Sequence, residues 1–304
     1  MIYVYCWGVC GAVREMRAAR LATISISPFS YCLNFFVGPF FIAGPRRHCS
    51  LSTTVRSLPL RIHDDHHHSP QNSAIKSWDK FYKRHQNKFF KDRHYLEKDW
   101  GQYFSDDNSE SPNGKVVLEV GCGAGNTIFP LVAAYPKLFV HACDFSPQAI
   151  TLVKSHVDFS EDRVDAFVCD VANNNLCDRI MPSSIDVVTL IFMLSAVCPE
   201  KMPLILLNIK KVLKPDGYVL LRDYALGDYA QVKLQNKNQM VSENFYIRGD
   251  GTCSFYFSED SLSALFTRSG FNIIDMNIYC RQIENRSRNI TMDRRWIRAI
   301  CSLP

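Results

Sequence analysis

The sequence lacks several motifs that would assign a function directly. It contains no C-x-x-C pair, no G-x-S-x-G turn and no Walker-type phosphate loop. Zinc ribbons, α/β-hydrolases and P-loop NTPases therefore have no basis in this chain. The 12 cysteines do not follow the spacing of metal ligands or of a disulfide framework, and we find no internal repeat.

Charge is modest and unevenly placed. The 35 basic and 30 acidic side chains give a net charge of +5, yet residues 101–304 are slightly acidic and the excess of Lys and Arg lies before them. A polyanion would therefore meet a local patch and not the whole surface. Hydrophobic residues make up 47% of the chain, which is enough for one core of about 200 residues. Cys122, Cys143 and Cys169 lie in or beside apolar runs, which indicates buried thiols in a reducing, intracellular compartment.

Residues 1–72 differ from the rest. Glu15 is their only acidic residue before Asp64, while arginine, serine and threonine are frequent. This composition is typical of a transit peptide for a mitochondrion or plastid, whereas a leader without function would leave the protein in the cytoplasm. The uncharged residues 21–44 could span a bilayer, but prolines and polar residues interrupt them, so we expect no stable membrane insertion. The histidine-rich run 63–68 favours a solvated linker over a metal site.

Residues 73–114 are expected to form an N-terminal helical segment. Ile75, Trp78, Phe81 and Tyr82 recur at three- and four-residue steps, which predicts one apolar helix face. The other face is basic, with Lys76, Lys80, Lys83, Arg84 and Lys88. Core packing could account for the apolar face and solvation for the basic one. A polar loop, 105–114, ends this segment.

From residue 115 the chain alternates strands with helices. Apolar runs predict strands at 115–120, 138–143, 163–169, 185–194 and 218–223, with helices at 127–134, from Ser146-Pro147 onward and at 203–213, before a turn at 214–217. A hairpin of 245–247 with 255–257, a helix at 259–269 and strands at 271–279 and 296–301 follow. This alternation predicts an α/β fold with a doubly wound, mostly parallel, Rossmann-like sheet over residues 115–304.

The first strand leads into a glycine-rich turn, Glu119-Val120-Gly121-Cys122-Gly123-Ala124-Gly125. Glycines there let the backbone approach a ligand. The spacing is G-x-G-x-G and not the G-x-G-x-x-G of dinucleotide folds, which disfavours an NAD oxidoreductase. Glu119 adds negative charge, so the turn suits a cationic ligand without phosphates, S-adenosylmethionine. A tight turn with no ligand is the alternative.

Two carboxylates follow the next two strands. Asp144 lies 19 residues after Gly125 and could accept both ribose hydroxyls of a nucleoside. Asp170 ends the third strand and could receive an adenine amino group. An aspartate after a strand also often caps the following helix or turn, and that reading stays open for each.

Several segments together resemble the tRNA 3-methylcytidine methyltransferases. They are Trp78-Asp79-Lys80-Phe81-Tyr82-Lys83-Arg84, the run 89–94, Cys143-Asp144-Phe145-Ser146-Pro147, the run 190–196, Arg222-Asp223-Tyr224 and the run 243–248. The resemblance runs from about residue 73 to about residue 303, and residues 1–72 have no counterpart. Family members usually have glycine after the Arg-Asp-Tyr tyrosine, where this chain has Ala225.

The resemblance implies a seven-stranded class I methyltransferase sheet with an N-terminal helical extension. It also implies which residues contact the cofactor: Trp78 and Tyr82 cover it, Gly121 meets its amino-acid part, Asp144 its ribose, Asp170 with Val171 its adenine, and Ile191 its reactive side. Gly123 and Glu119 join this set from the glycine-rich turn. The implied partner is tRNA, with an aminoacyl-tRNA synthetase as an optional helper.

The implied reaction is methylation of cytidine N3 in a tRNA loop, with the anticodon loop favoured, because N3 lies on the pairing edge of the base. Asp223 is our candidate catalytic residue, which would hold the exocyclic amine and offset the positive charge of the methylated base. The alternative is a structural role for Asp223, as a partner for Arg222 or as a turn cap. Phosphate contacts and a stacking surface are expected from Lys83, Arg84, Lys88, Phe89, Phe90, Lys91 and Arg93. A small-molecule or protein methyltransferase, and a non-catalytic RNA-binding subunit, remain as rivals.

Overall fold

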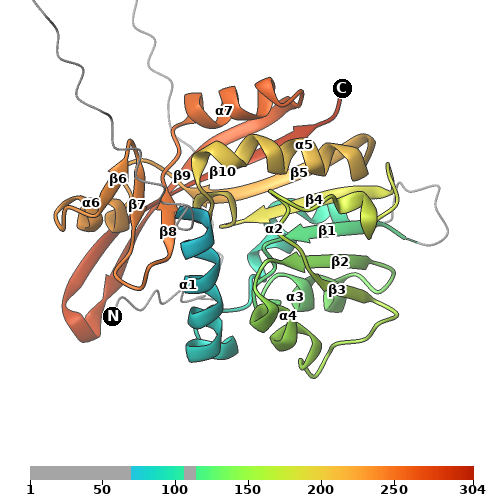
Figure 1. The fold of residues 1–304 in the computed structure, drawn as a ribbon, viewed down its shortest axis with the longest axis horizontal. Helices are drawn as coiled ribbons and strands as arrows, with labels where there is room; N and C mark the ends of the chain where they lie inside the picture. Colours follow the sequence, from blue (N-terminus) through green and yellow to red (C-terminus); the bar gives the residue numbers. More distant parts are fainter. Residues whose placement is uncertain (1–69, 106–113) are drawn as a thin grey trace, which may run out of the picture. The chain divides into compact units, whose positions relative to one another are not determined.

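The computed structural model describes residues 70–105 and 114–304, which belong to one structural unit (Figure 1). The expectations of a transit peptide, a membrane anchor and a histidine-rich linker concern residues 1–69 and lie outside this part. Among the described helices, none combines the length and the apolar character that crossing a bilayer demands. The eight cysteines of the described segments are free thiols.

A seven-stranded sheet with the order β3-β2-β1-β4-β5-β10-β9 forms the centre of this unit, as predicted (Figure 1). Its strands are β1 (Val116–Val120), β2 (Phe139–Asp144), β3 (Val164–Val168), β4 (Ile185–Ile191), β5 (Leu213–Tyr224), β9 (Asn272–Asn285) and β10 (Ile290–Ser302). Strands β1 to β5 pair in parallel, and β10 runs antiparallel to both of its neighbours. The strand order reverses between β1 and β4, and ligands of doubly wound sheets bind at such a switch point.

Helices cover both faces of the sheet because successive strand residues point to opposite sides. Leu118 and Val120 of β1 face α5 (Met202–Val212) and α7 (Glu259–Arg268), whose apolar residues join the same core. Val117 faces the opposite core, formed with α2 (Tyr95–Phe104), α3 (Ile128–Ala134) and α4 (Pro147–Lys154). The two layers of helices bury β1 and β4, and the carboxyl ends of these two strands lie at the switch point.

The N-terminal helical segment is confirmed and begins earlier than expected, with α1 spanning Pro70–His85. Phe81 of α1 is buried against Ala149 of α4, within a cluster that also holds Tyr82 and Phe89. The helix α2 is fastened to the sheet by Asp99, which pairs with Arg222 of β5 at 3.2 Å. The helix α1 is therefore held against α4, and α2 is held against the sheet.

The C-terminal third differs from the sequence expectation in detail. Residues 214–217, expected as a turn, belong to β5 but break its register with β4, and Asp216 has a left-handed φ of 60°. β9 and β10 extend far beyond the expected strands and form one long hairpin. The expected small hairpin is present as β7 (Phe245–Ile247) and β8 (Cys253–Phe255), joined by β6 (Met240–Ser242). The helix α6 (Tyr229–Gln235) was not expected.

Candidate cofactor and substrate site

The turn after β1 is built on three left-handed glycines. Gly121, Gly123 and Gly125 have φ values of 72°, 56° and 88°, a region that side chains disfavour. A Cβ on Gly121 would collide with Met193, and a Cβ on Gly123 would lie 2.7 Å from the Tyr82 hydroxyl oxygen. The backbone of the turn can therefore approach a ligand more closely than any other residue type would allow.

Asp144 connects this turn to the start of α4. Its Oδ2 accepts a hydrogen bond from Gly123 N at 3.0 Å, and its Oδ1 accepts one from Ser146 N at 2.9 Å. Burial raises the pKa of Asp144 to about 6, although these two donors oppose the shift. Each carboxylate oxygen can accept a second hydrogen bond, so these contacts are compatible with the predicted ribose contact. Ser146 caps α4 as expected, its Oγ accepting from Ala149 N at 3.2 Å.

The helix α1 closes the crevice over the glycine turn. Tyr82 is buried with its hydroxyl against Gly123. Trp78 stacks on Tyr82 with 5.9 Å between ring centroids, and its indole N–H is buried without a hydrogen-bond partner among the described residues. Phe81 supplies the core contact, so the apolar face of α1 serves both packing and the crevice.

Glu119 is the most unusual charged group here. It is 1% exposed, and neither carboxylate oxygen has a hydrogen-bond partner in the described part of the chain. Burial raises the pKa of Glu119 to about 8, against the opposing effects of the Arg93 guanidinium and of the Thr127 hydroxyl, which lies nearby without hydrogen-bond geometry. A buried acid without a partner costs stability, and a cationic ligand group would relieve that cost.

Asp170 is placed at the end of β3 as expected, where it also caps its own turn. Its carboxylate accepts from Ala172 N at 3.0 Å and from Asn173 Nδ2 at 2.7 Å. Val171 is buried, and its carbonyl accepts from Asn208 Nδ2 at 3.0 Å. The capping alternative is thus present, while the adenine contact stays a prediction.

Ile191, expected beside the reactive side of the cofactor, is buried at the end of β4. The next residue, Phe192, was not predicted as a site residue and has a left-handed φ of 56°. A bulky residue in this region stores strain, which clusters at functional sites. The Phe192 ring lies 5.0 Å from the Tyr224 ring, centroid to centroid. The strained turn therefore places an aromatic pair at the adjacent ends of β4 and β5.

Comparison with known proteins identifies the family. The chain is 42% identical over 224 residues to the tRNA N(3)-cytidine methyltransferase METTL6 of Rattus norvegicus, a match that covers 74% of this chain and 77% of the relative. It is 39% identical to the tRNA N(3)-methylcytidine methyltransferase trm141 of Schizosaccharomyces pombe, covering 74% of this chain and 90% of the relative. The chain belongs to the tRNA N(3)-cytidine methyltransferase family. A methyltransferase domain model matches residues 118–219.

The fold agrees with that of solved methyltransferases. A SAM-dependent methyltransferase from Anabaena variabilis ATCC 29413 superposes with a TM-score of 0.55 at 14% identity, covering 78% of this chain and 96% of the other. The expected class I fold, family and cofactor, S-adenosylmethionine, are confirmed. The glycine cradle, the unpartnered Glu119 carboxyl and the unpartnered Trp78 N–H fit that cofactor, which carries an ammonium and several acceptors.

The family's Arg-Asp-Tyr segment ends β5. Asp223 is fully buried, with Oδ2 accepting from Ser195 N at 3.0 Å and Oδ1 from Tyr224 N at 2.9 Å. Burial raises the pKa of Asp223 to about 6, and Ser195, Tyr224 N–H and Arg248 oppose the shift. Arg222 pairs with Asp99 and not with Asp223. Of the two structural roles that were alternatives for Asp223, an ion pair with Arg222 and a turn cap, only the turn contact is present. The catalytic role of Asp223 stays a prediction.

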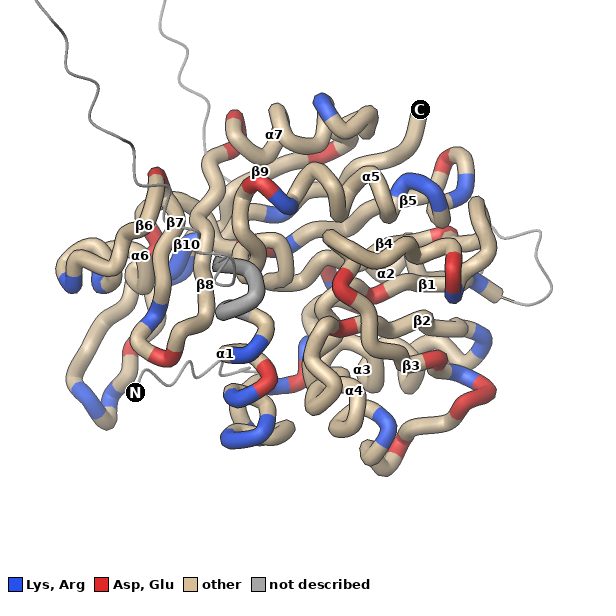
Figure 2. Tube along the Cα trace, viewed as in Figure 1, with Lys and Arg blue, Asp and Glu red and all other residues tan. Residues whose placement is uncertain are grey.

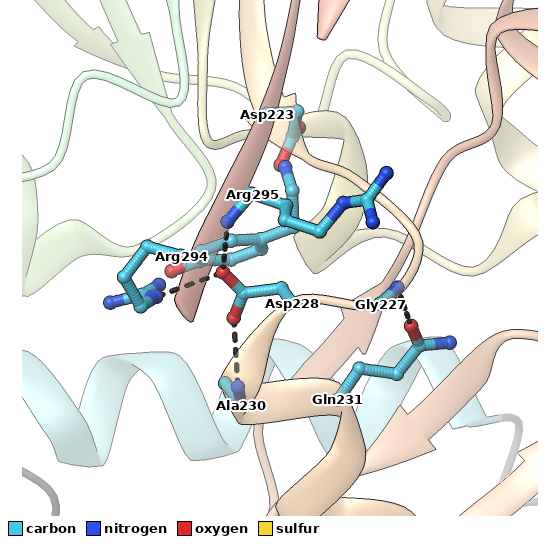
Figure 3. Close-up of polar contacts among 8 residues, drawn as sticks. Asp223, Gly227, Asp228, Ala230, Gln231, Arg294 and Arg295 are labelled. Carbon is cyan, nitrogen blue, oxygen red and sulfur yellow. Dashed lines mark hydrogen bonds and ion pairs between the residues drawn. The ribbon is translucent and has the colours of Figure 1, made fainter. Parts of the chain in front are cut away.

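The loop that follows β5 ends at another buried aspartate, Asp228 (Figure 3). Asp228 caps α6 through Ala230 N at 2.8 Å, pairs with Arg294 Nε at 2.8 Å and accepts from Arg295 N at 2.8 Å. These contacts tie α6 to β10. Ala225, where relatives usually have glycine, is buried without a left-handed φ, so the loop does not require glycine there.

The residues expected to contact RNA fall into two groups. Lys83, Arg84, Lys88 and Lys91 are exposed, and basic residues gather at the carboxyl end of α1 (Figure 2). Phe89 and Phe90 are half-buried against Phe81. Arg93 is half-buried and turned into the crevice, where it donates to Thr127 Oγ1 at 3.0 Å. No group of three or more His, Cys, Asp or Glu in the described ranges is placed to hold a metal ion.

Proposed function

We propose that the chain transfers the methyl group of S-adenosylmethionine to N3 of a cytidine in a tRNA loop, with the anticodon loop the first to test. The similarity that carries the proposal is the identity of 39–42%, over 74% of the chain, to relatives named for this reaction. The intact glycine turn with Glu119 and Asp144 disfavours a non-catalytic RNA-binding subunit.

The crevice residues would hold the cofactor. Gly121 and Gly123 let it approach the backbone, Asp144 accepts its ribose hydroxyls, and Asp170 with Val171 receives the adenine. Glu119 faces the ammonium of the methionine part, while Trp78 and Tyr82 cover the ligand from α1. Tyr82 and Glu119 are only 6% and 1% exposed, so little water reaches the residues expected to hold the cofactor.

Methyl transfer to cytidine N3 requires little acid–base catalysis from the protein. When bound, S-adenosylmethionine supplies a methyl group on a positively charged sulfur. Cytidine N3 carries a lone pair at neutral pH, so no residue has to remove a proton before the attack. Alignment of N3 with the methyl group, and stabilisation of the charge that develops on the base, are what the chain must contribute.

The ends of β4 and β5 are suited to that task. The rings of Phe192 and Tyr224 offer a stacking surface for an unpaired base, and Ile191 lies beside them. Asp223 directly precedes Tyr224 and is oriented by two backbone N–H donors. Above a pH of about 6 its carboxylate is ionised and can accept from the exocyclic amine while offsetting the positive charge of the methylated base.

The basic end of α1 would bind the phosphates of the RNA. Arg84 and Lys88 are exposed there, and Lys83 is also exposed although it pairs with Asp79 at 2.9 Å. Contacts of this kind give an affinity that falls as salt rises. A small-molecule or protein methyltransferase of the same fold would not bind tRNA in a salt-dependent way, so salt titration separates these alternatives.

Nucleoside mass spectrometry tests the proposal directly. Purified protein is incubated with S-adenosylmethionine and an unmodified tRNA pool, and the digest is examined for 3-methylcytidine. Formation of 3-methylcytidine with wild type and its loss with Asp144→Ala is the expected result. Methylated protein or a methylated small molecule, with unmodified tRNA, would overturn it. The same assay with and without aminoacyl-tRNA synthetases tests a helper, and a fluorescent fusion of residues 1–72 tests the transit peptide.

A further inference from the structure

Arg93 occupies a position that a phosphate contact does not explain. It lies between α1 and α2, and its guanidinium bridges the two sides of the switch point. Nη1 donates to Thr127 Oγ1 at 3.0 Å, at the start of α3, and to the Ile191 carbonyl at 3.4 Å, at the end of β4. The crevice between the carboxyl ends of β1 and β4 is where ligands of this fold bind.

The backbone around Arg93 is fixed to the glycine turn. Arg93 N donates to the Asn126 carbonyl at 2.9 Å, and Asn126 Nδ2 donates to Asp92 Oδ1 at 3.0 Å and to the Phe90 carbonyl at 3.3 Å. Asn126 directly follows the last glycine of the turn. The guanidinium is thus a built part of the crevice and not a mobile surface charge.

Arg93 and Glu119 carry opposite charges and lie near each other without a direct contact. Glu119 of β1 pairs in register with Thr189 of β4, two residues before the Ile191 carbonyl that Arg93 contacts, so the two groups lie at the same end of the sheet. The positive charge of Arg93 accordingly lowers the pKa of Glu119 against the effect of burial. They are nevertheless unpaired within the part of the chain that the structure describes, where both Glu119 oxygens lack a hydrogen-bond partner. Nε and Nη2 of Arg93 likewise donate to no residue in the described ranges. A carboxylate and a guanidinium that face one crevice without contact complement the two charged ends of an amino acid.

We infer that Arg93 binds the α-carboxylate of the cofactor's methionine part, opposite Glu119, which takes the ammonium. Arg93 is then a cofactor-binding residue, in place of the phosphate contact expected from the sequence. Its guanidinium also lies 5.6 Å from the centre of the Phe192 ring, so the same side chain touches the turn that carries the aromatic pair. This inference depends on the cofactor and not on the identity of the RNA.

The test compares S-adenosylmethionine with its decarboxylated form, which keeps the ammonium and lacks the carboxylate. Both are titrated calorimetrically into the protein without RNA. Wild type should bind S-adenosylmethionine about 10- to 100-fold more tightly, the range for a charge-assisted bidentate contact. Arg93→Met should abolish this preference by weakening S-adenosylmethionine alone. Glu119→Gln should weaken both ligands and keep the preference.

Two further variants serve as controls for this experiment. Lys98→Met removes an exposed positive charge from α2 and should leave the preference unchanged. Arg93→Lys keeps the charge and the aliphatic stem, so it should fold and show an intermediate preference, even where Arg93→Met melts early. Equal loss of both ligands in the Arg93 variants, or no preference in wild type, would overturn the inference. If wild type binds neither ligand, the cofactor assignment itself fails.

Discussion

The Asp79 carboxylate of α1 lies 2.8 Å from the Ser146 hydroxyl, which donates to it at the start of α4. The same oxygen, Oδ1, accepts from Gln148 N at 3.1 Å. Ser146 N in turn donates to Asp144, and Asp144 accepts from Gly123, against which Tyr82 lies. A closed ring of contacts therefore joins the covering helix to the carboxylate expected to hold the ribose.

Asp79→Ala should weaken the cofactor by about 3- to 30-fold while the sheet stays folded, because one shared acceptor is worth roughly 1–2 kcal/mol. Asp79→Asn keeps an oxygen acceptor and should lose much less. Lys83→Met is the control, since its exposed pair with Asp79 contributes little. Titration with S-adenosylhomocysteine, together with hydrogen exchange across α1, measures both effects. Equal affinity in wild type and Asp79→Ala would mean that α1 does not help to bind the cofactor.

The buried Glu119 predicts an unusual pH dependence of stability. Its pKa is raised by burial to about 8, from 4.5 in the unfolded chain. Between these values the folded state holds a proton that the unfolded state has lost, so stability falls as pH rises. Without cofactor, Glu119→Gln should match wild type near pH 4.5 and exceed it by up to about 4 kcal/mol near pH 9. Urea unfolding at several pH values provides the measurement.

Cofactor binding should show the opposite trend. An ammonium favours the ionised form of Glu119, so wild-type affinity should rise with pH up to about 8, and binding should release a proton. The affinity of Glu119→Gln should stay flat over the same range. Calorimetry in two buffers of different ionisation enthalpy counts the proton, and an uptake or a flat wild-type profile would contradict a contact with Glu119.

Exposed basic residues should control RNA affinity and not cofactor affinity. Arg84→Gln combined with Lys88→Gln leaves Lys83 to its pair with Asp79 and removes two expected phosphate contacts. The slope of log affinity against log salt for tRNA should become shallower by about 1.5, with unchanged binding of S-adenosylhomocysteine. Filter binding between low and moderate salt measures the slope. An unchanged slope would place the RNA on another surface, for example around the exposed Arg286.

The sequence predicts the parts of this fold that depend on local pattern. The strands β1 and β4 are mostly apolar because helices bury both faces of the sheet. The Ser146-Pro147 pair specifies where α4 begins. The glycine spacing identifies the cofactor turn because only glycine tolerates its backbone. In each case the physical cause lies within a few neighbouring residues.

Features set by distant contacts could not be predicted in this way. Arg93 resembles the neighbouring surface lysines in sequence, and only its contacts with Thr127 and Ile191 place it in the crevice. Most residues of β9 are exposed and none is buried, so no apolar alternation indicates how far this strand of the hairpin extends. The left-handed Phe192 leaves no local signal. The helix α6 did leave one, since Asp228 is an N-cap residue that could have been recognised.

The buried pair of Asp228 with Arg294 should be a stability determinant. The two side chains are 0% and 4% exposed, so removing one partner leaves an uncompensated buried charge. Asp228→Asn should lower the free energy of unfolding by about 3–5 kcal/mol. Glu284→Gln, at an exposed pair with Arg286, should change it by less than about 1 kcal/mol. Denaturant unfolding measures both, and Asp228→Asn with Arg294→Met should recover part of the loss.

Asp223 provides the test that separates catalysis from binding. Asp223→Asn is nearly isosteric, but an amide cannot offset the charge of a methylated base. Single-turnover methylation should slow by about 10²–10³, while affinities for S-adenosylhomocysteine and tRNA hold, because their expected contacts lie elsewhere. The burial-raised pKa of Asp223, about 6, adds a signature: the wild-type rate should fall as pH drops below about 6, and the slow rate of the variant should not.

If Asp223 has only a structural role, a different result is expected. Asp223 orients Ser195 N and Tyr224 N, and the amide can accept from only one of them. If that orientation is its whole contribution, Asp223→Asn should lower the melting temperature and weaken tRNA together with the rate, and the pH profile of the rate should match that of wild type. Retention of tRNA affinity with a lost rate and a flattened profile would instead assign Asp223 to the charge that develops on the cytidine during transfer.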